Sequence, residues 1–229
     1  MKMKSKRMMF SRLFACLMTF YITCLLLSNL IAGKMMAMGD VTLPAAVILF
    51  PITYILADVF TEVYGFNNMR TVIWLGFACS AFAVLIYMAA IALPYPAFWE
   101  NQEAFRTVLG TTPRVFAASL AGYLFGEFSN AVILSRLKVL TRGKRLWTRT
   151  VGSTIVGEAF DTVIFISVSF WGTMENAALF RMMLGQYLFK VCYEILFTPV
   201  TYAVIGKLKK VEGIDTFDEN ADYNPFAGK

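Results

Sequence analysis

Apolar stretches of membrane-spanning length alternate with short polar segments along nearly the whole chain. A helix needs about 20 mainly apolar residues to cross a bilayer. Six stretches meet this length, at residues 13–33, 43–64, 71–93, 115–137, 150–171 and 182–206. The pattern predicts an all-α polytopic integral membrane protein, in which residues 1–206 form one bundle of six transmembrane helices. Residues 207–229 are polar and are expected to form a cytoplasmic tail.

The basic residues predict how this bundle is oriented. With the N-terminus inside, the inner segments hold sixteen Lys and Arg and the outer segments hold four, while Lys190 lies within a span. Cytoplasmic loops carry such an excess of basic residues. Both termini are therefore expected in the cytoplasm. Six membrane crossings, an even number, also place both termini on the same side of the membrane.

Composition supports a membrane protein and narrows the chemistry. Charged residues make up 16% of the chain, against about 25% in soluble domains. The net charge of +6 comes from residues clustered beside apolar spans, which argues against binding to nucleic acid. The chain has no histidine, and its four cysteines lie in apolar runs without the spacing of a metal or redox site. We therefore expect no metal and no cofactor.

Acidic side chains occur inside the predicted spans, where charge is expensive. Each costs on the order of 2.5–3.5 kcal/mol on insertion scales, so a chain that keeps several of them is expected to use them. The spacing places the members of each pair on one helix face, three or four residues apart. These acids outnumber the single embedded base, Lys190. The embedded acids are Asp58, Glu62, Glu127, Glu158, Asp161 and Glu194.

A purely structural interpretation explains part of this set. Lys190 and Glu194 can neutralise each other within one helix, and Glu62 can reach the inner headgroups. Asn29 and Asn130 can bond helices together. The excess of acids remains unexplained, because buried carboxylates must be protonated or paired. A ligand with several donors or a positive charge meets that demand.

Aromatic residues interleave with the acids and suggest what the ligand is. Rings stack on flat heterocycles, and carboxylates accept hydrogen bonds from ring N–H and amino groups. The sequence thus predicts one acidic, aromatic-lined intramembrane cavity for a flat base. Its expected substrate-binding residues are Asn29, Asp58, Glu62, Tyr123, Glu127, Asn130, Glu158, Asp161, Lys190, Tyr193 and Glu194.

Several separated motifs resemble one family, the queuosine precursor transporters, also called the vitamin uptake transporter family. They are Asp58-Val-Phe-Thr-Glu-Val-Tyr-Gly65, Gly126-Glu-Phe-Ser-Asn130, Gly157-Glu-Ala-Phe-Asp-Thr162, Lys190-Val-Cys-Tyr-Glu194 and Asn224-Pro-Phe226. The resemblance implies uptake of 7-cyano-7-deazaguanine and 7-aminomethyl-7-deazaguanine across the bacterial inner membrane. Our leading hypothesis is therefore a secondary transporter for these bases. These bases are precursors used in tRNA modification. It does not say which acid contacts which substrate atom.

Two other functions compete with this one. The chain can be the substrate-binding membrane subunit of an ATP-driven vitamin importer, in which case the ATPase is another chain, since no Gly-x-x-x-x-Gly-Lys-Ser/Thr loop is present. An intramembrane enzyme would use Lys190 beside a serine, or Asp58 with Asp161, but no further motif supports it. Gly122 and Gly126 are four residues apart and form a face of small residues that permits close helix approach. Such glycine faces and the uncharged third span also allow a homodimer.

Overall fold

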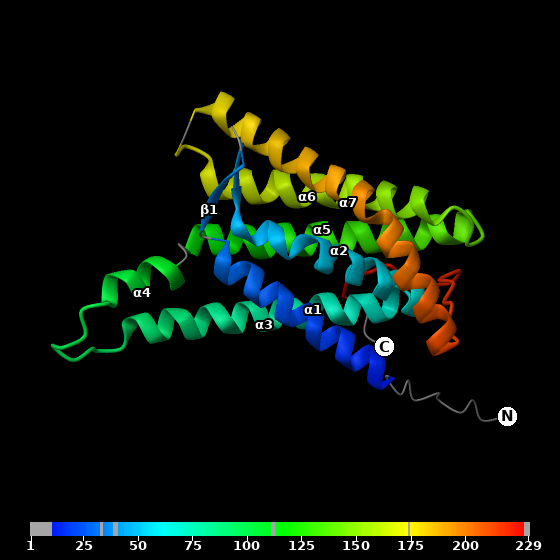
Figure 1. The fold of residues 1–229 in the computed structure, drawn as a ribbon, viewed down its shortest axis with the longest axis horizontal. Coiled ribbons are helices and arrows are strands. Elements are labelled where there is room, and N and C mark those ends of the chain that lie inside the picture. The colour runs from blue at the N-terminus through cyan, green and yellow to red at the C-terminus, as the bar shows by residue number, and fades with distance from the viewer. Residues whose placement is uncertain (1–10, 33, 39–40, 111–112, 174, 227–229) are drawn as a thin grey trace.

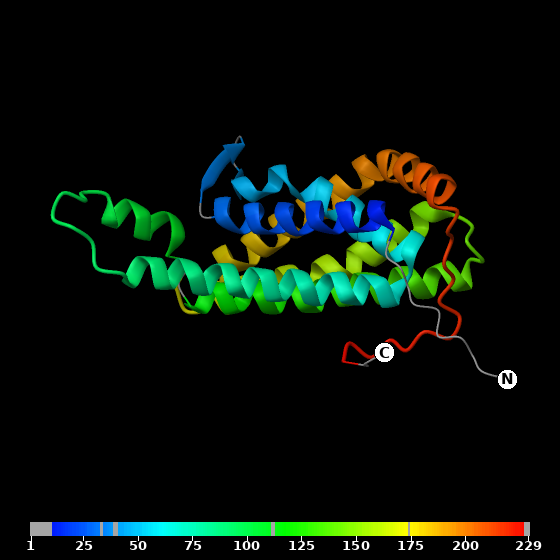
Figure 2. The same ribbon diagram turned by 90° about the horizontal axis from the view of Figure 1, so that it is seen from below.

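The fold is that of a computed structural model, which describes residues 11–32, 34–38, 41–110, 113–173 and 175–226. The basic N-terminal residues Lys2, Lys4, Lys6 and Arg7, used above for orientation, lie outside the described residues. The described chain is a bundle of roughly antiparallel helices, drawn in Figure 1 with the long axis horizontal. Helix α1 begins at the end of the bundle where α7 finishes (Figures 1 and 2).

Five segments are long and apolar enough to cross a membrane, among the residues that the structure describes. Four are the helices α1 (Arg12–Ile31), α3 (Phe66–Ala92), α6 (Leu146–Phe170) and α7 (Asn176–Glu212). The fifth contains α5 (Pro113–Leu140). The prediction of a helical, multi-pass membrane protein is therefore confirmed.

The predicted span at residues 43–64 is broken into three helical pieces. A 3-10 turn η1 (Ala45–Ile48) leads into α2 (Phe50–Val59), which continues into a single π-helical turn η2 (Phe60–Tyr64). Pro51 lies in the first turn of α2, where its missing N–H leaves no carbonyl unpaired. The apolar pattern indicated the length of this segment but not its breaks.

Two small elements were not predicted. The strands β1 (Met35–Met38) and β2 (Val41–Pro44) pair as an antiparallel hairpin between α1 and η1. The segment after α3, expected to be a polar loop, contains the short helix α4 (Gln102–Leu109). Both lie at the end of the bundle opposite the start of α1 (Figure 1). The all-α prediction holds for the membrane bundle and misses the hairpin.

Glycines let α5 and α6 pack closely, as the small-residue spacing predicts. A Cβ on Gly126 would lie 2.9 Å from the Cβ of Asp161, and one on Gly157 would lie 2.9 Å from the Cβ of Asn130. A Cβ on Gly122 would lie 2.8 Å from Oδ1 of Asp161. The close approach therefore holds Asp161 directly against α5.

The C-terminal segment packs back onto the bundle. Helix α7 continues past the predicted boundary at residue 206 to Glu212, and the chain then crosses the ends of η2, α3 and α5. Asp218 accepts hydrogen bonds from the backbone N–H of Phe66 at 2.8 Å and from Ser135 at 2.7 Å. Figure 2 shows this red segment descending along one end of the bundle. The expected tail is thus anchored by specific contacts.

Candidate functional site: an acidic cavity inside the bundle

A cavity of about 810 Å³ lies between the helices. It extends from Asp58 and Asn130 toward the end that carries α4, where Pro44, Val108 and Arg181 line it. Ligand pockets commonly have volumes of about 300–1,000 Å³, so this one is large enough for a heterocyclic base. The four segments predicted to carry embedded acids all line it, together with residues of α1, α3 and α4.

Eight of the eleven predicted site residues line this cavity. They come from five helices, and they are Asn29, Asp58, Tyr123, Glu127, Asn130, Glu158, Asp161 and Lys190. Carboxylates from α2, α5 and α6 therefore meet around one enclosed space. The aromatic side chains Tyr54 and Phe165, also expected near the acids, line the same cavity.

Lys190 is held by acids of the neighbouring helix. Its Nζ atom lies 2.6 Å from Oε2 of Glu158 and forms a second ion pair with Asp161. The Nζ atom also lies 5.3 Å from the centroid of the Phe50 ring. The expected neutralisation of Lys190 by Glu194 within α7 is not the arrangement found, because α6 supplies both partners.

The remaining acids of the cavity keep free acceptor atoms. Asn130 donates a hydrogen bond to Oδ1 of Asp58 at 3.5 Å, while Oδ2 of Asp58 has no hydrogen-bond partner in the described part of the chain. Oε2 of Glu127 and Oδ1 of Asn130 are likewise buried without a partner. Buried acceptors without donors are unfavourable, so a ligand that brings two or more N–H groups would be stabilised here.

Glu62 lies away from the cavity, in a separate network at the end where the C-terminal segment docks. Arg149 donates two hydrogen bonds to its carboxylate, from Nε at 2.8 Å and from Nη2 at 2.7 Å. Lys209 donates a third at 2.7 Å, and Lys138 lies at 3.5 Å. Glu62 is fully buried. Its surroundings therefore resemble a structural ion cluster more than a binding surface.

Asp215 joins this network from the C-terminal segment. Its carboxylate contacts Lys138 at 2.5 Å and Lys209 at 2.9 Å. Partial burial acts to raise the pKa of Asp215, but the hydrogen bonds from the two lysines outweigh it and hold the pKa below its usual value. The network thus ties α5, α6, α7, η2 and the C-terminal segment together.

The other two predicted site residues lie on α7 outside the cavity lining. Glu194 is buried, and its Oε1 atom has no hydrogen-bond partner within the described ranges. Tyr193 stacks on Phe197 with ring centroids 4.6 Å apart. Neither residue lines the cavity.

Sequence reasoning did not select several residues that the fold places at the site. Tyr21 and Thr154 line the cavity, and Tyr21 interacts electrostatically with Glu127 and Tyr123. Arg149 was counted only as a loop cation, although it binds Glu62. Its position next to a predicted span is the signal that could have suggested it as a partner for an embedded acid. Among the described residues, no group of three or more His, Cys, Asp or Glu is placed to hold a metal ion.

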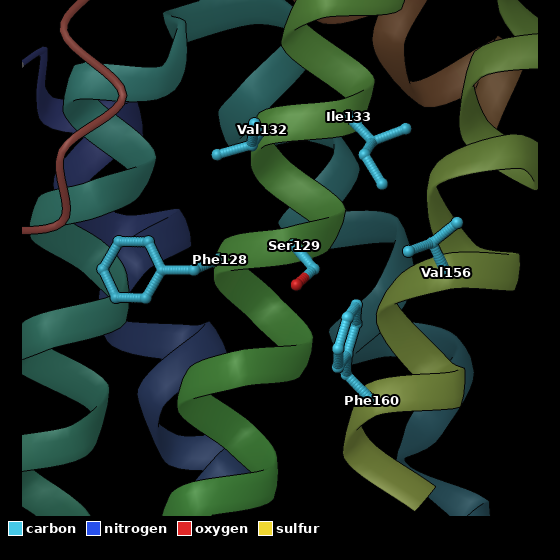
Figure 3. A pocket seen from close by; sticks show the side chains of 6 residues that line it. All are labelled: Phe128, Ser129, Val132, Ile133, Val156 and Phe160. Atoms are coloured by element: carbon cyan, nitrogen blue, oxygen red, sulfur yellow. The ribbon is translucent and has the colours of Figure 1, made fainter. Parts of the chain in front are cut away.

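A second hollow of about 290 Å³ lies between α5 and α6. Figure 3 shows Ser129 and Ile133 of α5 on the side of Val156 and Phe160 of α6, while Phe128 and Val132 of α5 point to the other side. None of these six side chains is charged, and Phe160 is 48% exposed. This hollow therefore suits lipid chains and not a polar base.

Comparisons with known proteins identify transporters as relatives of this chain. The sequence pattern of the family described as "Putative vitamin uptake transporter" matches residues 44–204. A "Probable queuosine precursor transporter" of Bacillus subtilis (strain 168) is 28% identical over 178 residues, which cover 77% of each chain. The "Queuosine precursor transporter" of Escherichia coli (strain K12) is 26% identical over 159 residues, 68% of this chain and 69% of that one. A search of solved structures gives no significant match.

Proposed function

The chain belongs to the vitamin uptake transporter family, and we propose that it imports queuosine precursors of the 7-deazaguanine type. The family assignment also confirms that the protein is a membrane transporter and not an enzyme. The observation that carries the proposal is the cavity that Asp58, Glu127 and Glu158 line from three different helices.

The chemistry of the cavity fits a guanine-like edge. Such an edge presents a ring N–H beside an amino group, which are two parallel donors. Oδ2 of Asp58 and Oε2 of Glu127 are acceptors without a hydrogen-bond partner among the residues that the structure describes. An adenine-like edge would place an acceptor against them and leave buried polar groups unpaired, which disfavours it strongly. Tyr54 and Phe165 supply faces for stacking.

The transport direction follows from the proposed orientation. We place both termini in the cytoplasm, with the broken segment η1–α2–η2 as a sixth crossing. The cavity then opens toward the outside, and the Glu62 network lies on the cytoplasmic side below it. Release of the base into the cell requires that network to loosen, as in alternating access around a fixed site. A homodimer in the bacterial inner membrane remains part of this proposal.

Uptake of labelled 7-cyano-7-deazaguanine tests the proposal in cells that lack their own route for the base. We expect uptake with the wild-type chain and at least a tenfold loss for each of Asp58→Asn, Glu127→Gln and Glu158→Gln. Glu219→Gln, in the exposed C-terminal segment, is the matched control and should transport normally. Normal uptake by all three cavity variants would refute the site.

Reconstitution separates a secondary transporter from a subunit of an ATP-driven importer. Purified protein in vesicles should exchange external labelled base for internal unlabelled base with no ATPase present. Exchange that appears only after an ATPase subunit is added would favour the alternative.

A further inference from the structure

Two buried carboxylic groups lie behind the cavity, on helices α2 and α7, which pack together. Asp58 of α2 and Glu194 of α7 are 1% and 2% exposed. The two carboxyl groups interact electrostatically. Asp58 lines the cavity, whereas Glu194 lies outside its lining. One acid can therefore contact a substrate and the other cannot reach it.

No cation neutralises this pair among the described residues. The groups that interact with Asp58 are Asn130 and Glu127 of α5 and Glu62 of η2, and Glu194 interacts with Glu158 of α6. The nearest embedded base, Lys190, is bound to Glu158 and Asp161. The three cations around Glu62 are engaged there. Oδ2 of Asp58 and Oε1 of Glu194 also have no hydrogen-bond partner.

Two carboxylates in an apolar interior cannot both ionise without a counterion, because like charges and desolvation both oppose it. The pair is therefore most stable with one proton. We propose that Asp58 and Glu194 form a proton-binding site, and that a proton carried there enters with each molecule of base. This inference rests on the proposed function and adds its energy source.

The arrangement explains how base and proton are coupled. A base that donates N–H groups binds best when Asp58 is an anion. Asp58 can be an anion at low cost only while Glu194 is protonated. Binding of the base therefore favours the proton on Glu194, and the proton favours the base by the same factor, as linkage requires.

The decisive experiment uses purified protein in vesicles with the membrane potential clamped at zero. The probe is labelled 7-cyano-7-deazaguanine, which is uncharged, so that only a proton gradient can drive its accumulation. With the outside one pH unit more acidic, coupling of one proton per base predicts about tenfold accumulation. A trapped pH dye should report protons entering with the base. Absence of accumulation in vesicles that exchange the base normally would overturn the proposal, and so would accumulation driven by sodium.

Glu194→Gln isolates the role of the second acid. Glutamine keeps the shape and neutrality of the protonated side chain but cannot release a proton. We expect it to retain base exchange and to lose accumulation driven by the pH gradient, with Glu219→Gln behaving as wild type. Full accumulation by Glu194→Gln would refute the assignment. If this variant does not fold, the dye measurement on the wild-type protein decides the question alone.

These outcomes separate the two proposals. Vesicles that neither exchange nor accumulate the base would refute the proposed function itself. Vesicles that exchange the base but carry no protons would leave the function standing and refute only the proton site.

Discussion

The ion cluster around Glu62 gives the sharpest prediction about stability. Arg149 supplies two of the hydrogen bonds to this buried carboxylate, at 2.7 and 2.8 Å. Arg149→Met removes the guanidinium and keeps an apolar side chain of similar length. Breaking a buried pair by removing one partner typically costs about 3–5 kcal/mol. Lys209 remains at 2.7 Å and Lys138 at 3.5 Å, so we expect the lower end, about 3 kcal/mol.

A loss of about 3 kcal/mol lowers the folding equilibrium constant by about two orders of magnitude. Unfolding by sodium dodecyl sulfate in mixed micelles, followed by circular dichroism, measures this change. Arg142→Met is the control, because Arg142 is exposed and no ion pair involves it in the described part of the chain. Arg142→Met should unfold at the same detergent fraction as the wild-type protein.

The double variant completes the test. Removing both charges with Glu62→Gln and Arg149→Met should cost less than the sum of the single changes, since each single change leaves an unpaired partner. Base affinity in the folded Glu62→Gln protein should stay close to that of the wild type, because Glu62 does not line the cavity. The reasoning is refuted if Arg149→Met is as stable as the wild-type protein. It is also refuted if the losses of the two single variants add up strictly in the double variant.

Three further changes test the packing and the docked C-terminal segment. Gly157→Ala would place a Cβ 2.9 Å from the Cβ of Asn130. We therefore expect the free energy of unfolding to fall by about 1–3 kcal/mol and uptake to decrease, as measured by unfolding and transport assays. Unchanged values would show that α5 and α6 can separate freely. Asp218→Ala removes the acceptor of Phe66 N–H and Ser135 and should cost about 1–3 kcal/mol in the same unfolding assay, whereas a neutral result would mean the segment adds no stability. The lowered pKa of Asp215 means that its contribution is present above the ordinary aspartate pKa of about 3.9 and is lost as pH falls through the folded value. Asp215→Asn should therefore be less stable than wild type at pH 7 and should lack this part of the acid dependence, which parallel unfolding curves across pH would reveal.

The sequence alone determined the membrane bundle, its polar stripes and the family. Stretches of about 20 apolar residues are read directly from the chain, and embedded acids are conspicuous because lipid does not solvate them. The spacing of Gly122 and Gly126 also indicated a close helix contact, which the structure confirms. These features depend on neighbours within one helix, which the sequence order fixes.

Tertiary structure decided which charges meet. Glu62 belongs to a cluster with Arg149 and Lys209, residues 87 and 147 positions away, and Lys190 pairs with α6 instead of with Glu194 on its own helix. The sequence could place each group on a helix face but could not say which faces lie opposite one another. That depends on helix rotation, on the breaks at η1 and η2 and on the returning C-terminal segment. Partner choice among buried charges is therefore a property of the packed bundle.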